Sequence, residues 1–362
     1  MGAGMTAITP DTLDGLFAGR DFRAPRIDLN GKTILITGGT GSFGRRFVKT
    51  VCEEYTPKKL IIFSRDELKQ YEMAQDFPPS KWPFLRYFIG DVRDETRLDM
   101  AMRDVDVVIH AAALKHVPIA EYNPFECIKT NVIGAENVVR AAIKRNVRKV
   151  CALSTDKAAS PINLYGASKL ASDKIFTAAQ HMGGRDGPRF CVVRYGNVVG
   201  SRGSALPFFK KLISEGATSL PITDPRMTRF WITLDQGVNF VLSSLEMARG
   251  GETFIPKIPS MSMTDLAHSL APDLPHEVIG IRPGEKLHET MIPEDDARQS
   301  VEFPDRYAIL PAFDGELRAR YLAEGAKACP EDFAYASDNN PERLDARSLQ
   351  ALLGDRLRAL TA

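Results

Sequence analysis

The sequence lacks an excess of charge of either sign: 47 Lys and Arg residues stand against 46 Asp and Glu residues, for a net charge of +1. A protein that binds nucleic acid through its phosphates needs a basic excess, so this balance argues against that class. No apolar run approaches the roughly 18 residues that span a membrane. Residues 1–30 contain Asp11, Asp14 and Asp21 where a secretory signal would be apolar. We therefore expect a cytoplasmic protein with neither a nucleic-acid nor a membrane partner.

Cysteine is also scarce, with five residues in a chain of 362. No two of them form a CxxC pair, and their number is odd. Such scattered thiols are typical of reduced core residues rather than of a disulfide framework or a zinc site, so no metal is expected. The five are Cys52, Cys127, Cys151, Cys191 and Cys329.

From Lys32 onward, short β-branched runs alternate with amphipathic segments. The runs are apolar on both faces, as expected of parallel strands covered by helices on each side. The alternation predicts an α/β fold: a Rossmann-type, doubly wound parallel sheet with right-handed crossovers. The expected strands are Thr33–Thr37, Leu60–Ser64, Arg86–Ile89, Val105–His110, Lys149–Ser154 and Phe190–Tyr195, and the expected helices are Arg45–Glu54, Glu95–Met102, Pro124–Arg145 and Tyr165–His181.

The chain divides into four expected parts. Residues 1–29 form an N-terminal extension with a short helix starting at Thr9, and 30–197 form the Rossmann domain. Residues 198–300, richer in Gly, Pro and Ser, form a smaller substrate-binding region, from which later segments return to the main sheet. Residues 301–362 form a C-terminal extension that ends in a packing helix with a leucine stripe, although 291–337 are poorly patterned.

A glycine cluster follows the first expected strand. Gly38, Gly41 and Gly44 give GxxGxxG, the spacing of extended short-chain dehydrogenases. The first glycine permits a tight turn, the second lets the backbone approach a pyrophosphate, and the third lets helix and strand pack closely. The phosphates then meet the free amides of the helix N-terminus. This context predicts a dinucleotide site.

The end of the second strand bears on the cofactor. An acidic residue there would bind the ribose 2′-hydroxyl of NAD, whereas Arg accommodates the 2′-phosphate of NADP. Ser64 and Arg65 come first and favour NADP, while Asp66 keeps NAD open. Asp91 and Val92 follow the third strand and are expected to contact adenine, although Asp91 could instead cap the next helix.

A second set of polar residues follows the fifth strand. Tyr165 and Lys169 are four apart on a helix and so share a face. A nearby ammonium lowers the pKa of a phenol, so the tyrosine can remove a hydroxyl proton. Asp156 and Lys157 add a further acid and base, which suits a sugar dehydration. The alternatives are an exposed loop ion pair, a nucleotide-sugar 4-epimerase that leaves both idle, and a non-enzymatic NADP-binding scaffold.

Several segments closely resemble the inverting UDP-N-acetylglucosamine 4,6-dehydratases that begin pseudaminic acid synthesis, over about residues 31–355. An N-terminal segment of about 30 residues is extra. The resemblance implies a homo-oligomer acting on UDP-N-acetylglucosamine. The resembling segments are Thr37–Gly44, Ser64–Lys69, His110–Val117, Ser154–Lys169, Arg194–Gly203, Met227–Thr233 and Ile281–Glu289.

The resemblance also implies residue roles. Asp156 acts as acid toward the 6-hydroxyl and Lys157 as base at carbon 5, where burial and the charge of Lys169 would lower the lysine pKa. Tyr165, Lys169 and Thr155 serve the hydride step. Related retaining dehydratases carry Met in place of Tyr165, so a tyrosine here predicts inversion at carbon 5, with a retaining enzyme as the alternative.

The remaining expected contacts fall into two groups. Arg282 offers a planar fork to a diphosphate, although a surface arginine is the alternative. Around the cofactor we expect Gly38, Thr40, Gly41, Ser42, Phe43, Gly44, Ser64, Arg65, Asp91, Val92, Ala111, Ala112, Lys115, Asn131, Tyr165 and Lys169, and around the nucleotide sugar Lys115, Thr155, Asn197, Val198, Arg202, Arg282 and Glu285.

Overall fold

The computed structural model describes residues 20–184, 186–201, 204–312, 314–346 and 348–349. The short helix expected at Thr9 and most of the leucine-striped terminal helix lie outside these residues. Among those described, no helix is long and apolar enough to cross a membrane.

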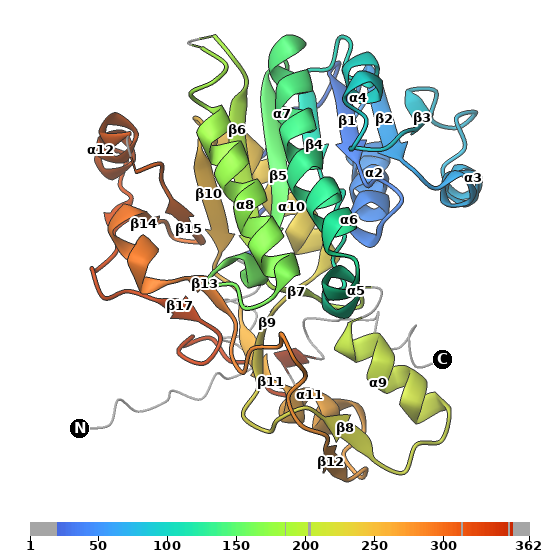
Figure 1. Ribbon diagram of the computed structural model, residues 1–362, viewed down its shortest axis with the longest axis vertical. Helices are drawn as coiled ribbons and strands as arrows, with labels where there is room; N and C mark the ends of the chain where they lie inside the picture. The colour runs from blue at the N-terminus through green and yellow to red at the C-terminus, as the bar shows by residue number, and fades with distance from the viewer. Residues whose placement is uncertain (1–19, 185, 202–203, 313, 347, 350–362) are drawn as a thin grey trace.

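One ten-stranded sheet organises the molecule, in the order β16-β14-β15-β10-β6-β5-β4-β1-β2-β3 (Figure 1). From β3 to β10 every pairing is parallel, as the alternating sequence pattern predicts. The later strands β14 and β15 return antiparallel at the other edge. The strands are β1 Thr33–Thr37, β2 Lys59–Ser64, β3 Leu85–Ile89, β4 Val107–His110, β5 Lys149–Thr155, β6 Arg189–Tyr195, β10 Glu252–Pro256, β14 Ser300–Glu302, β15 Arg306–Ile309 and β16 Lys327–Ala328.

Helices cover both faces of the sheet. On one face, Phe47 of α2 and Phe240 of α10 pack with Ile34 of β1. On the other, Phe176 of α8 lies in one cluster with Leu35 of the same strand, which is why the central strands are apolar throughout. The expectation that every strand is buried on both faces is wrong for β3, whose residues are largely half-buried or exposed because it is the edge strand. The covering helices are α2 Ser42–Glu54, α3 Glu67–Asp76, α4 Glu95–Ala101, α7 Gly134–Lys144, α8 Leu164–Ala179 and α10 Leu234–Met247.

The helix expected over Pro124–Arg145 is interrupted. It runs as α6 Pro124–Ile128, a π-helical turn η1 Lys129–Ile133, and α7. Single π turns inside helices are frequent at functional sites, because the extra residue redirects a side chain. Here Asn131 lies within the turn and is buried. The short helix α5 Val117–Tyr122 precedes this stretch.

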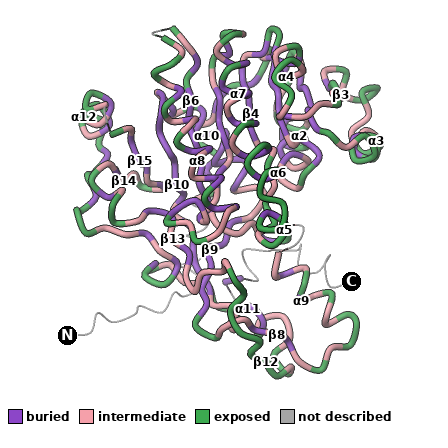
Figure 2. Tube along the Cα trace, viewed as in Figure 1, coloured by how far each residue is buried: buried purple, intermediate pink, exposed green. Residues whose placement is uncertain are grey.

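A smaller lobe lies beyond the carboxyl ends of the parallel strands, and its helices are more exposed than the main sheet (Figure 2). Its own core gathers around the fully buried Trp231, with Leu206, Phe209 and Leu266. Its elements are β7 Asn197–Val198, α9 Ala205–Ser214, β8 Leu220–Ile222, β9 Thr228–Ile232, β11 Ser260–Ser262, α11 Met263–Leu270 and β12 His276–Val278.

The poorly patterned stretch 291–337 is structured. Its first strand, β13, pairs antiparallel with its last, β17, and this pairing carries the end of the stretch to the carboxyl edge of β5 (Figure 1). Short strands with polar ends give little periodic signal, so the sequence pattern missed them. The elements are β13 Thr290–Ile292, η3 Glu294–Gln299, β14, β15, α12 Gly315–Ala323, β16 and β17 Tyr335–Ala336.

Candidate active site

A cavity of about 810 Å³ opens at the carboxyl ends of the parallel strands, between the sheet and the smaller lobe. This edge is where ligands bind in open α/β sheets. The predicted site residues that line it are Gly38, Thr40, Gly41, Ser42, Phe43, Gly44, Ser64, Arg65, Asp91, Val92, Ala111, Ala112, Lys115, Thr155, Lys157, Tyr165, Lys169, Asn197, Val198 and Glu285.

The glycine loop has the shape of a phosphate cradle. Gly38 has φ of 66°, and a Cβ there would lie 2.8 Å from the Ala112 backbone nitrogen. A Cβ on Gly44 would lie 2.3 Å from the carbonyl oxygen of Gly39, so only glycine lets α2 pack this closely against the loop. Gly41 caps α2 without a side-chain hydrogen bond, which leaves the first helix amides facing the cavity. A dinucleotide pyrophosphate fits this arrangement.

The end of β2 presents a cation. Arg65 is half exposed and lies 3.7 Å from Asp91. Asp66 is engaged elsewhere, because it accepts a hydrogen bond from the Lys69 amide as the cap of α3 and pairs with the Lys69 ammonium at 2.6 Å. Asp91 binds Arg93, and the cap of α4 is Asp94, so the capping alternative for Asp91 is wrong.

Tyr165 and Lys169 lie on the first turns of α8, whose cap Asn163 accepts a hydrogen bond from the Gly166 amide at 2.7 Å. Burial raises the pKa of Tyr165 to about 12, against the charge of Lys157 and a hydrogen bond with Thr155. Burial lowers the pKa of Lys169, which donates to the Leu153 carbonyl at 2.7 Å. The ammonium acting on the phenol is therefore Lys157, where the sequence predicted Lys169.

Asn131 lies behind this pair rather than on the cavity wall. Its amide donates to the Leu114 carbonyl and to Ser168 Oγ, both at 2.9 Å. Ser168 in turn donates to the Tyr165 carbonyl at 2.7 Å. The π turn thus supports the first turns of α8, which carry Tyr165 and Lys169. Asn131 acts on them indirectly, through Ser168.

A second brace supports α8 one turn further on. Asp173 accepts a hydrogen bond from Ser154 Oγ at 2.7 Å and pairs with Arg194 of β6 at 3.2 Å. Arg194 also donates to the Met291 carbonyl of β13 at 2.8 Å. Both partners of the ion pair are almost fully buried, so the pair ties α8, β6 and β13 into one unit.

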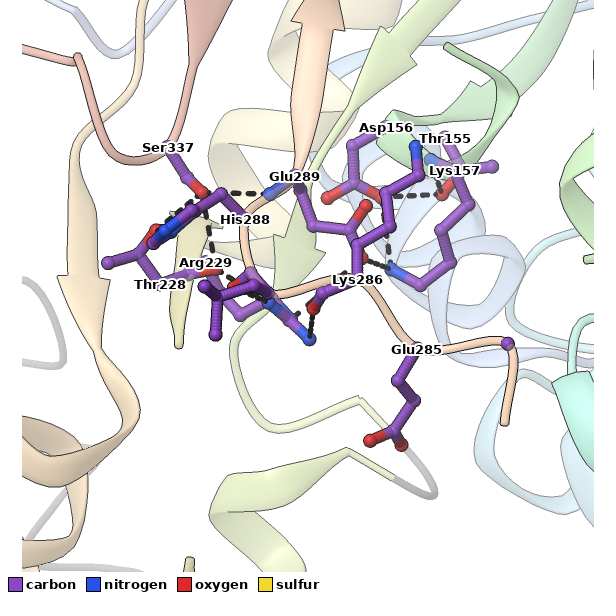
Figure 3. A network of polar contacts seen from close by, with 12 residues as sticks. Thr155, Asp156, Lys157, Thr228, Arg229, Glu285, Lys286, His288, Glu289 and Ser337 are labelled. Carbon is purple, nitrogen blue, oxygen red and sulfur yellow. Dashed lines mark hydrogen bonds and ion pairs between the residues drawn. The ribbon is translucent and has the colours of Figure 1, made fainter. Parts of the chain in front are cut away.

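Lys157 lies between two carboxylates, as Figure 3 shows. Its Nζ is 3.1 Å from Asp156 Oδ1 and 3.1 Å from Glu289 Oε1. Burial alone would lower the pKa of Lys157, but the two carboxylates outweigh it and the pKa is raised. The expectation of a lowered pKa is therefore wrong, because it left out the attraction of Asp156 and of Glu289 for the ammonium.

Asp156 is fully buried and does not line the cavity. Its Oδ1 also accepts a hydrogen bond from Thr155 Oγ1 at 3.0 Å, and its Oδ2 has no hydrogen-bond partner among the described residues. The alternative of an exposed loop ion pair is wrong for Asp156 and Lys157, since the lysine side chain is only a quarter exposed.

Sequence reasoning gave no role to Glu289, Arg229 or Lys286, which line the same cavity. Glu289 is 1% exposed and lies 3.8 Å from Arg229 Nε of β9. Arg229 fixes the approach to β13 by donating to the Leu287 and Lys286 carbonyls at 3.1 and 2.9 Å. Lys286 donates to the Ala159 carbonyl at 2.6 Å. The segment resemblances covered these residues, but an isolated Glu before a short strand carries no local signal.

The predicted diphosphate contacts are only partly brought together. Glu285 lines the cavity, and Figure 3 shows its side chain turned away from the Lys157 cluster. Arg282 lies 3.7 Å from Glu285 but is mostly exposed and does not line the cavity. Arg202 lies outside the described residues. Among the described residues, no cluster of His, Cys, Asp or Glu is arranged to hold a metal ion.

Comparison with known proteins gives four findings. The family model described as polysaccharide biosynthesis protein matches residues 34–311. A UDP-N-acetylglucosamine 4,6-dehydratase (inverting) of Campylobacter jejuni is 62% identical over 317 residues, 86% of this chain and 94% of the relative. A UDP-glucose 4-epimerase of Rickettsia canadensis is 42% identical over 330 residues, 89% of this chain and 95% of the relative. The structure of Pen from Bacillus thuringiensis has a TM-score of 0.81 and 37% identity, covering 90% of this chain and 99% of that one.

Proposed function

Because the chain belongs to the polysaccharide biosynthesis family and, within it, to the inverting UDP-N-acetylglucosamine 4,6-dehydratases, we propose that it catalyses this dehydration. The observation that carries the proposal is a second acid–base centre at Lys157, in the same cavity as Tyr165 and Lys169. A 4-epimerase needs only the tyrosine and lysine pair. The buried carboxylates around Lys157 give this site the extra proton-transfer capacity that removal of water requires.

We propose that the glycine cradle holds NADP, with Arg65 at the 2′-phosphate. When bound, the nicotinamide ring accepts hydride from carbon 4 of the sugar and returns it to carbon 6. Tyr165 takes the proton of the 4-hydroxyl, which Thr155 holds in place, and the positive charge of Lys157 favours the phenolate. Tyr165 and Lys169 are both buried, so solvent has little access to compete for these protons.

Lys157 then removes the proton at carbon 5, which the neighbouring ketone has made acidic. Asp156 enters this step carrying a proton and supplies it to the departing 6-hydroxyl through the hydroxyl of Thr155, which lines the cavity and is hydrogen-bonded to Asp156. Tyr165 returns its proton to carbon 5. Acid–base groups on opposite faces of one carbon produce inversion, whereas one group on one face would return the proton where it came from. The product is UDP-2-acetamido-2,6-dideoxy-β-L-arabino-hexos-4-ulose.

The test is turnover of UDP-N-acetylglucosamine in deuterated water. We expect a 4-keto-6-deoxy product that carries deuterium at carbon 5, with ring couplings of the L-arabino sugar in proton NMR. An early product of D-xylo configuration would reassign the chain to a retaining dehydratase. The Rickettsia relative named as an epimerase makes 4-epimerisation the second candidate, recognised by a product that keeps its 6-hydroxyl.

From the same membership we propose that the enzyme is a cytoplasmic homo-oligomer and that its product enters pseudaminic acid synthesis. Light scattering of the purified chain tests the assembly, and a single-chain mass would contradict it. Conversion of the product to a pseudaminic acid precursor by the next enzymes of that pathway tests the second point.

A further inference from the structure

The raised pKa of Lys157 poses a problem for a base. An ammonium cannot take a proton from carbon 5, so Lys157 must first lose one. The groups that act on its charge come from four elements, and two of them are close enough to accept a proton directly. The two are Asp156, in the short 3-10 helix η2 Asp156–Ala158, and Glu289, ahead of β13. The other groups are Arg229 of β9, Lys286 of the loop before β13, and Tyr165 of α8.

The two carboxylates differ in what else they touch. Asp156 Oδ1 is shared between Lys157 and the hydroxyl of Thr155, and the residue is closed off from the cavity. Glu289 borders the cavity, and its Oε1 faces Lys157. Its Oε2, like Asp156 Oδ2, is buried without a hydrogen-bond partner among the described residues, so access to the cavity is what distinguishes Glu289. A buried carboxylate with an unpaired oxygen is costly as an anion and less so once protonated.

We propose that Glu289 is a positioning residue that holds Lys157 and takes its proton at the start of each turnover. The inference rests on the proposed function. The N–H bond at Lys157 Nζ breaks, an O–H bond forms at Glu289 Oε1, and the freed lone pair takes the carbon 5 proton. The electrons of that C–H bond pass into the sugar as the 6-hydroxyl leaves with the proton of Asp156.

The cluster then resets without solvent. Lys157, again an ammonium, passes a proton to Asp156 and receives the one held by Glu289, because it is 3.1 Å from both carboxylates. Summed over the turnover, the carbon 5 proton has left in the water molecule and the three side chains hold their original protons. Lys157 is thus the bridge between the two carboxylates as well as the base.

The test compares the full-length enzyme with Glu289→Gln, which keeps the shape and the contact to Lys157 but accepts no proton. We expect kcat to fall by about 10²–10⁴-fold while KM for the UDP-sugar changes little. Lys157 must then lose its proton to solvent, so the residual kcat should rise about tenfold per pH unit through the alkaline range, where the wild type is flatter. Oxidation at carbon 4 needs only the charge of Lys157, which Glu289→Gln leaves in place, so reduced-cofactor absorbance should accumulate.

Glu289→Asp restores a carboxylate and should recover part of kcat together with the flatter pH profile. The matched control is Glu252→Gln on β10, a fully buried carboxylate outside the cavity, which should leave the pH profile unchanged. A Glu289→Gln enzyme with near-normal kcat would overturn the inference. So would a loss with the wild-type pH profile, no reduced cofactor and no rescue by Asp.

Two further outcomes are separated by design. If Glu289→Gln does not fold, Glu289→Asp carries the test, and an unchanged kcat in that variant would overturn the inference. If the wild type itself releases no water from UDP-N-acetylglucosamine, the proposed function is wrong. Wild-type dehydration combined with a fully active Glu289→Gln overturns only the role of Glu289.

Discussion

Lys157 is the residue on which the proposed chemistry depends most. We expect Lys157→Ala to bind cofactor and UDP-sugar but to lose about 10²–10⁴-fold in kcat, because no other amine lies between the two carboxylates. Kinetics at saturating substrate measure the loss in kcat, and ligand titration measures the retained binding. The control is Lys49→Ala, half exposed on α2 and paired with Glu53. Near-normal turnover of Lys157→Ala would require another base.

Arg65 should set the choice of cofactor. Because Asp66 is committed to capping α3, the guanidinium is the group at the end of β2 that is left to meet a 2′-phosphate. Arg65→Asp should therefore weaken NADP binding and shift preference toward NAD, while Asp66→Asn should mainly loosen α3. Affinities for both cofactors, measured by fluorescence titration, decide this. An unchanged NADP affinity in Arg65→Asp would contradict it.

At this scale the sequence was informative where a residue type is demanded by backbone geometry. Gly38 and Gly44 could be placed in the cofactor loop because a side chain at either would collide with backbone atoms. Glu289 could not, because its position follows from the pairing of β13 with β17 and from the hold of Arg229 on the preceding carbonyls. Those contacts join segments that no local pattern connects.

Strand β4 ends in a titrating group that is hidden in the fold. Burial lowers the pKa of His110 from 6.5 to about 3, and Thr37 Oγ1 lies 2.9 Å from its Nδ1. Below pH 6.5 the unfolded chain binds a proton at this histidine that the folded chain does not bind. The free energy of unfolding therefore decreases as the pH falls from 6.5 toward 3. Between pH 7 and 5 this group should cost about 2 kcal/mol.

His110→Asn keeps an acceptor for Thr37 and removes the titration. The difference in free energy of unfolding between the wild type and this variant should therefore shrink by that amount from pH 7 to 5. Urea unfolding at both values measures it. His276→Asn, at an exposed strand position, is the control and should show no such narrowing. A constant difference for His110→Asn would mean that the histidine is protonated in the folded protein.

Elements were predictable in proportion to their apolar content. The β1 to β6 strands, which apart from the edge strand β3 are apolar across both faces, were located within about two residues. Strands β14 and β16 were not predicted from the sequence because they are short and have polar neighbours. They are held by pairing to a sheet that is formed by other parts of the chain. The π turn escaped because its sequence continues the helical pattern on both sides.

Over the whole molecule, the buried pair of Arg194 and Asp173 joins the early and late parts of the chain. Arg194→Met should cost about 3–5 kcal/mol, because it leaves Asp173 charged and unpaired in the interior. The double variant Arg194→Met with Asp173→Leu should recover much of that loss. Urea unfolding measures the free energies, with the exposed pair of Arg140 and Glu136 as a control whose removal should change stability little. Additive losses would show that the two charges act independently.

The site is assembled from both ends of the chain, and this has a consequence during synthesis. The cofactor wall is largely complete in sequence at Lys169, whereas the Glu289 amide donates a hydrogen bond to Ser337 Oγ, beside β17. At about 5–20 residues per second, the 168 residues from 169 to 337 take roughly 8–34 s to translate. For that interval a nascent chain on the ribosome carries its dinucleotide-binding residues but lacks the complete proton-transfer cluster, so under the proposed function dehydration can begin only once the chain is nearly finished.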